Sequence, residues 1–189
     1  ELNGVDYIGL SSSELHGRNF DQETSRSAVG QPIGSFFVYE ADGLFQSDAE
    51  IQNYKNDRGE LLQPNAKPGD IRFKDLNGDG VINSDDRDFK GNPLPDCSMG
   101  LTLGFNYKNF DVSAFFQGVF GNEVYNLTNY LGEFYNQAQY NKNSTILDAW
   151  RPDNTDTDIP RVTLDDPNNN IRPSTYYIHN ASFVRLKNL

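Results

Sequence analysis

Residues 99–117, MGLTLGFNYKNFDVSAFFQ, constrain the fold more than any other stretch, because apolar residues alternate there with small or polar ones. Alternation with a period of two is typical of a β-strand that has one apolar face. If Lys108 and Asn109 form a two-residue turn, Tyr107 pairs with Phe110, and Asn109 tolerates the positive φ that such a turn needs. Apart from Phe115, the apolar residues then share one face of an antiparallel hairpin. This apolar set is Met99, Leu101, Leu103, Phe105, Tyr107, Phe110, Val112, Ala114 and Phe116.

Two environments suit such a face. In a soluble β-sandwich it packs against a second sheet, and the pattern alone favours this interpretation because soluble sheets are more common. In a membrane barrel it faces lipid, and Tyr107 and Phe110 lie in an interfacial aromatic girdle. The nine residues from Met99 to Tyr107 fall within the ~9–11 that a tilted strand needs to cross the hydrocarbon.

Composition narrows the class of protein. The 189 residues suffice for one domain with a sizeable core, and the aromatic residues lie in short alternating runs between clusters of Asn, Asp, Gly and Pro, which predicts a mainly β fold. The net charge of -11 repels phosphates, so no nucleic acid partner is expected. The single cysteine, Cys97, cannot form an internal disulfide and is predicted to be a small buried residue.

Other elements are predicted from local signals. A short strand spans Phe36–Tyr39 and ends at a turn formed by Asp42 and Gly43. Ser47 and Glu50 fit a capping box that starts a helix reaching about Tyr54. Further predicted elements are a strand at Ile71–Lys74, a helix at Thr145–Trp150 capped by Asn143 or Ser144, and a strand that runs to Leu189.

The stretch Asp75–Asp86, DLNGDGVINSDD, matches the calcium-loop pattern with oxygen donors at every ligand position. The predicted ligands are Asp75, Asn77, Asp79, the Val81 carbonyl, Asn83 and Asp86. Gly80 permits the sharp turn, whereas Asp86 departs from the pattern, because it is one methylene shorter than the usual glutamate. We expect one structural Ca²⁺, and the alternative is an Asx-rich turn without a metal.

Catalysis has little support in the sequence. His16 and His179 lie in loop-like surroundings, without a nucleophile elbow or paired metal ligands, so no catalytic or cofactor-binding residues are assigned. Trp150, Tyr130 and Tyr135 would either stack on sugar rings or pack within their loop. The Asn-x-Ser/Thr triplets at Asn126, Asn143 and Asn180 are interpreted as coincidence in an Asn-rich chain.

Several stretches, in this order, resemble the C-terminal part of the SusC/RagA family of TonB-dependent outer-membrane transporters. They are VGQPIGSFFVYEADGLFQS, GDIRFKDLNGDGVINSDDRDFKGNPLPD, LTLGFNYKNFDVSAFFQGVFGNEVYN, DIPR and FVRLKNL. The resemblance implies antiparallel strands of a partial outer-membrane β-barrel, with long extracellular loops, a few short helices and Lys108–Asn109 as a periplasmic turn. Residues 1–29 would be a polar strand or loop segment. Residues 30–189 would be the barrel segment, including the calcium-type loop 75–86 and the long loop 118–170.

The resemblance also implies a function. Such transporters lie in the outer membrane of Gram-negative bacteria, contact its lipid, work with a SusD-like surface lipoprotein, and take up oligosaccharides or peptides with energy from TonB. No plug, TonB-contacting box, signal peptide or closing strand is identified here, so we expect a part of a longer receptor. The alternative is a soluble, calcium-stabilised β module that binds carbohydrate, which would bury Leu103, Phe105, Val112 and Ala114 under a second sheet.

Overall fold

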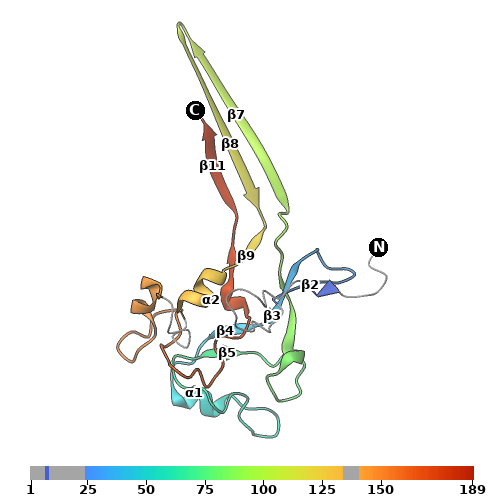
Figure 1. Ribbon diagram of the computed structural model, residues 1–189, viewed down its shortest axis with the longest axis vertical. Helices are drawn as coiled ribbons and strands as arrows, with labels where there is room; N and C mark the ends of the chain where they lie inside the picture. The colour runs from blue at the N-terminus through green and yellow to red at the C-terminus, as the bar shows by residue number, and fades with distance from the viewer. Residues whose placement is uncertain (1–6, 9–23, 134–140) are drawn as a thin grey trace.

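The computed structural model describes residues 7–8, 24–133 and 141–189, which form mainly antiparallel strands with a few short helices, as predicted (Figure 1). The strands make four sheets, with the orders β1–β2–β3–β6, β4–β5, β10–β9 and β11–β8–β7. The strands are β1 (Tyr7–Ile8), β2 (Ser25–Ser27), β3 (Ser35–Tyr39), β4 (Ala41–Leu44), β5 (Ile71–Phe73), β6 (Arg87–Gly91), β7 (Cys97–Tyr107), β8 (Phe110–Phe120), β9 (Glu123–Tyr125), β10 (Ile178–Asn180) and β11 (Phe183–Asn188). The α-helices are α1 (Asp48–Asn53) and α2 (Leu127–Glu133), and short 3-10 turns span Ser84–Asp86, Ser144–Asp148 and Thr175–Tyr177.

Strands β7 and β8 form the predicted hairpin. Their register runs without interruption from Cys97 opposite Phe120 to Tyr107 opposite Phe110, as the alternation requires. The positive φ of the turn, 52°, is at Lys108, so the prediction that Asn109 takes it is wrong. The Lys108 ammonium lies 5.3 Å from the centre of the Tyr107 ring, a distance at which the cation is attracted to the ring face.

The apolar face of this hairpin is uncovered. Leu103, Phe105 and Phe110 are 53%, 64% and 72% exposed, and within the described residues the hairpin pairs only with β11 and has no second sheet over it. Figure 1 shows β7, β8 and β11 projecting away from the remaining elements. The same openness leaves Cys97 exposed at the start of β7, so its predicted burial is wrong.

The remaining elements form a compact body at the opposite end from the hairpin tip, with the hydrophobic core inside it. One cluster of buried residues joins β4 and β5 to the later loops and consists of Leu44, Ile71, Phe73, Tyr130, Trp150 and Tyr177. A second cluster under α1 consists of Phe45, Ile51 and Ala66. Because Trp150 and Tyr130 belong to the first cluster, these two aromatic side chains pack within the body.

Amide side chains replace a strand along one edge of β5. The other edge pairs with β4. On the free edge, the Ile71 N–H donates to Asn170 Oδ1 at 2.9 Å, and the Phe73 N–H donates to Gln63 Oε1 at 2.8 Å. The Ile71 carbonyl accepts from the amides of Gln63 and Asn168, both at 3.0 Å. The buried edge is thus satisfied by side chains from two distant loops, which is what burial of backbone polar groups demands.

A buried ion pair lies beside this edge. Asp70 is fully buried, and its carboxylate accepts from Arg161 Nε at 2.6 Å and Arg161 Nη2 at 3.1 Å. Asn170 Nδ2 at 2.9 Å and the Lys67 N–H at 2.8 Å supply further hydrogen bonds. Gly69 allows this approach, because a Cβ there would lie 2.5 Å from the Trp150 ring and 2.8 Å from the Arg161 Cβ. The segment around Arg161 is therefore fixed against the start of β5.

The predicted strands at Phe36–Tyr39 and Ile71–Lys74 appear as β3 and β5, and the predicted C-terminal strand as β11. Helix α1 also forms as expected, with Ser47 Oγ accepting from the Glu50 N–H. The Glu50 carboxylate, however, accepts from the Gln46 N–H at 2.9 Å. The predicted turn at Asp42–Gly43 is wrong, because both residues lie within β4 where its register with β5 shifts.

One helical prediction needs correction, and one helix was missed. The expected helix at 145–150 is a 3-10 turn at Ser144–Asp148, and Asn143 stands at its N-cap without a side-chain hydrogen bond. Helix α2 was not predicted, although Asn126 Oδ1 accepts from the Asn129 N–H at 3.1 Å in the manner of an N-cap. The loop predicted at 118–170 thus contains regular structure that supplies Tyr130 to the core.

We predict that Asn170→Ala loosens β5, because the substitution leaves the Ile71 N–H without its acceptor and removes one of the donors to Asp70. A buried group left unpaired costs about 1–3 kcal/mol. Hydrogen exchange of the full-length protein should then show faster exchange across residues 63–73, with little change after the control Asn65→Ala at an exposed position. Unchanged protection in the Asn170 variant would contradict the role of this amide.

Candidate functional site

The acidic loop 75–86 connects β5 to β6, so strands and no long helices flank it. Its side-chain oxygens bind its own backbone. Asp75 accepts from the N–H groups of Gly78 at 2.7 Å and Gly80 at 2.8 Å. At 2.8 Å each, Asn77 accepts from the Asp79 N–H and Asp79 accepts from the Val81 N–H. These Asx turns coil the loop through hydrogen bonds between its own residues.

Asp86 closes the loop from its far end and is fully buried. Its carboxylate accepts from the N–H groups of Leu76 at 2.9 Å, Asn77 at 3.4 Å and Asn83 at 2.8 Å. Asn83 Oδ1 in turn accepts from the Asp85 N–H at 2.8 Å, which forms a capping box around the turn Ser84–Asp86. The two ends of the loop are therefore joined through one buried carboxylate.

Amide nitrogens surround the carboxylate of Asp79, another predicted ligand. Asp79 Oδ2 accepts from Asn77 Nδ2 at 3.1 Å and Asn83 Nδ2 at 3.2 Å. The same Asn83 nitrogen lies 3.3 Å from the Val81 carbonyl. The pKa of Asp79 is lowered, first by the Val81 N–H and then by the amide of Asn77. An amide nitrogen thus stands between two of the oxygens predicted to bind a cation.

The structure brings the predicted ligands into one loop, but it does not gather their carboxylates around one point. Among the described residues, no group of three or more His, Cys, Asp or Glu side chains is placed to hold a metal ion. Each Asp75 oxygen uses one hydrogen bond, and a carboxylate oxygen has two lone pairs, so Asp75 retains acceptor capacity. Metal ligation would require Asn83 Nδ2 to leave its place between Asp79 and Val81.

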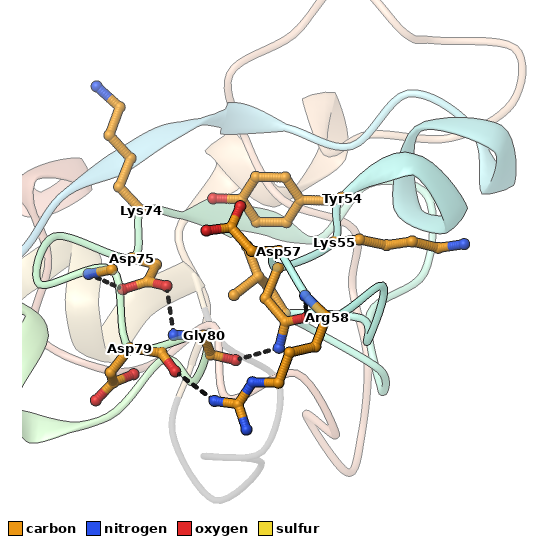
Figure 2. Close-up of a pocket in the computed structure, with 11 residues that line it drawn as sticks. Tyr54, Lys55, Asp57, Arg58, Lys74, Asp75, Asp79 and Gly80 are labelled. Atoms are coloured by element: carbon orange, nitrogen blue, oxygen red, sulfur yellow. Dashed lines mark hydrogen bonds between the residues drawn. The ribbon is translucent and has the colours of Figure 1, made fainter.

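A polar pocket of about 400 Å³ lies against this loop, as Figure 2 shows. Residues 54–58 and Leu62 form one wall, and Lys74, Asp75 and residues 78–80 form the other. Two contacts tie the walls together. Asn56 Nδ2 donates to the Gly80 carbonyl at 3.2 Å, and Arg58 Nη2 donates to the Asp79 carbonyl at 3.1 Å. Gly80 permits this docking, since a Cβ there would lie 2.7 Å from Asn56 Nδ2.

The pocket lining mixes charges of both signs. Lys55 and Arg58 accompany Asp57, Asp75 and Asp79. Tyr54 donates its hydroxyl to the Phe73 carbonyl at 2.7 Å, and burial raises the pKa of this phenol. Among the described residues, none of these groups forms a nucleophile–base pair, and the polar lining suits binding of a polar group.

The remaining residues singled out from the sequence lie elsewhere. His179 is exposed in β10, opposite Val124 of β9. His16 and Tyr135 lie outside the described residues. No helix in the described part of the chain is long and apolar enough to span a membrane.

No family model matches the chain, but individual proteins do. It is similar to TonB-dependent receptor P26 of Formosa agariphila, with 36% identity over 187 residues, which cover 99% of this chain and 18% of that protein. It is also similar to TonB-dependent receptor SusC of Bacteroides thetaiotaomicron, with 29% identity over 97% of this chain and 15% of that protein.

Solved structures of related proteins also match this chain. The RagAB peptide importer in its "open-open" state matches with a TM-score of 0.62 at 22% identity, over 99% of this chain and 17% of that one. The RagAB peptide transporter matches with a TM-score of 0.57 at 26% identity, over 96% and 17%. The chain belongs to the SusC/RagA family of TonB-dependent receptors.

This SusC/RagA chain spans between 15% and 18% of the length of the relatives it matches. Receptors of this family are outer-membrane proteins of Gram-negative bacteria, which is the localisation expected from the resemblance. Membership also explains why the β7–β8 face is apolar and uncovered, because in an outer-membrane barrel such a face meets lipid.

We predict that Asp86→Ala disorders the loop of this SusC/RagA chain, because three backbone N–H groups lose their acceptor. The expected cost is about 1–3 kcal/mol of local stability. Hydrogen exchange of residues 75–86 in the full-length receptor measures it. The control is Asp85→Ala at an exposed neighbouring position. If both variants retained wild-type protection in the presence of a chelator, the buried carboxylate would have no metal-independent role.

Proposed function

We propose that this chain forms part of an outer-membrane transporter that imports glycans or peptides together with a SusD-like surface lipoprotein, using energy supplied through TonB. Two matched structures are described as a peptide importer and a peptide transporter, which supports uptake of peptides. The relatives are named as receptors, and the pocket offers no catalytic pair, so we expect no enzymatic activity.

The observation that carries the proposal is the division between the β11–β8–β7 sheet and the body (Figure 1). The sheet presents an exposed apolar face whose exposed fraction is 53% at Met99 and 57% at Tyr107. Its tip is a two-residue turn, which suits the periplasmic side, where barrel turns are short. The body then lies on the extracellular side with the acidic loop and the pocket.

The alternative of a soluble carbohydrate-binding module is less well supported. It requires a second sheet over Leu103, Phe105 and Val112, and these side chains are exposed in the described structure. An exposed apolar face of this extent is a liability in water but is required in a barrel wall.

Uptake by living cells tests the transport proposal. A strain lacking the full-length gene should lose growth or labelled uptake on one glycan or peptide mixture, and a strain lacking TonB should lose the same uptake. Affinity purification of the receptor should recover the SusD-like lipoprotein. Normal uptake of every tested nutrient in the deletion strain would reject an essential transport role.

We predict that Leu103→Arg destabilises the full-length barrel by about 2–4 kcal/mol, because arginine would face the hydrocarbon. Thr102→Arg is the matched control, since Thr102 lies on the other face of the same strand. The stability of both variants is measured by urea unfolding in detergent or liposomes. The folded fraction is detected by its gel mobility without heating. Equal effects of the two substitutions would contradict the assignment of the lipid face.

We further propose that loop 75–86 binds one structural Ca²⁺ through Asp75, Asn77, Asp79, the Val81 carbonyl, Asn83 and Asp86. The support is the six-position sequence match and the hydrogen bonds that already hold these side chains in one coil. The cation would neutralise carboxylates that repel one another, and its effect would be local order.

Calcium titration of a metal-stripped full-length receptor should release heat and protect residues 75–86 from hydrogen exchange. The expected stabilisation is about 2.7 kcal/mol when calcium is a hundredfold above Kd. Asp79→Asn should weaken binding, because it removes one charge from the ligand set. The absence of both heat and protection at millimolar calcium would leave the loop as a metal-free Asx turn.

A further inference from the structure

Strand β11 contains one more residue than the stretch of β8 that it pairs with. The pairs from Phe183 opposite Val119 to Leu186 opposite Phe116 follow one register. The next pair is Asn188 opposite Phe115, and the register shifts between Leu186 and Asn188. Lys187 is therefore an additional, unpaired residue, which is the definition of a β-bulge.

Rows of directly paired residues show which face each side chain shares. Paired residues in neighbouring strands lie on the same face of the sheet. The rows across β7, β8 and β11 on the apolar face are Met99–Gly118–Val184 and Leu101–Phe116–Leu186. The row Gly100–Gln117–Arg185 lies between them on the opposite face. Up to Leu186, β11 thus follows the alternation of the hairpin.

The bulge changes the face of the residues that follow. In an uninterrupted register, Asn188 would stand opposite Ala114 and join the row of Leu103, in the middle of the apolar face. In the structure Asn188 stands opposite Phe115 and joins the row of Thr102 on the other face. If the shifted register continues by one residue, Leu189 comes opposite Ala114, and Leu189 is 87% exposed.

We propose that the Lys187 bulge sets the phase of β11, so that the lipid-facing surface continues through Leu189 while Asn188 faces away from lipid. A one-residue change of phase exchanges the two faces of a strand, so the extra residue is needed wherever apolar positions are three apart. Val184 and Leu186 are two apart, as in a regular strand, whereas Leu186 and Leu189 have the three-residue spacing. The inference rests on the proposed barrel function.

Arginine substitution of the full-length receptor tests the phase, because the two registers predict opposite results. With the bulge, Leu189→Arg puts a charge into lipid and should lower the amount of folded receptor in the outer membrane roughly ten-fold or more. Asn188→Arg should be tolerated. The reverse result, or equal effects of the two substitutions, would overturn the proposal.

Deletion variants give an independent measurement. Removing Lys187 should be tolerated, since Asn188 and Leu189 then reach the same partners in an uninterrupted strand. Removing Arg185 is the matched control and should cause a large loss, because Leu186 and Lys187 would exchange faces. Equal loss in both deletions would contradict the bulge. Failure of the Leu103 and Thr102 pair to differ would instead reject the barrel assignment itself.

Discussion

The buried carboxylate of Asp70 is the interaction on which the body depends. A charge removed from water is tolerated only when it is paired and hydrogen-bonded. Arg161 supplies the opposite charge, and Asn170 supplies a further donor. Both come from about a hundred residues further along the chain, so the pairing forces the segment after Trp150 to lie against β5. The same Asn170 amide accepts from the Ile71 N–H, so the ion pair and the edge of β5 are joined through one side chain.

The two parts of the chain are built for different surroundings. In the body, aromatic residues are inside, as with Tyr177, which is fully buried. In the β11–β8–β7 sheet they are outside, as with Phe105 and Phe110. The same composition thus serves two environments. In the sheet, β8 is hydrogen-bonded to a strand on each side, whereas in the body the buried edge of β5 is satisfied by side chains such as Gln63.

The sequence predicted most of what depends on local spacing. The alternation between Met99 and Phe116 determined the hairpin register, and the pattern from Asp75 to Asp86 located the self-bonded loop. Burial was less predictable, since Cys97 is exposed only because nothing covers β7. Helix α2 escaped prediction because its capping signal at Asn126 is short, and the Asn170 contact joins segments 99 residues apart, which no local pattern reveals. Whether the loop ligates a metal is likewise a matter of side-chain orientation, which spacing does not specify.

Gly69 has an evolutionary consequence. No side chain fits there while Trp150 and Arg161 keep their places, because the space that a Cβ needs is occupied by both. Any receptor of this kind that acquires a larger residue at this position must first give up the indole or shift the arginine, and the arginine neutralises Asp70. The glycine, the tryptophan and the ion pair should therefore be inherited together or lost together across descendants of a common ancestor.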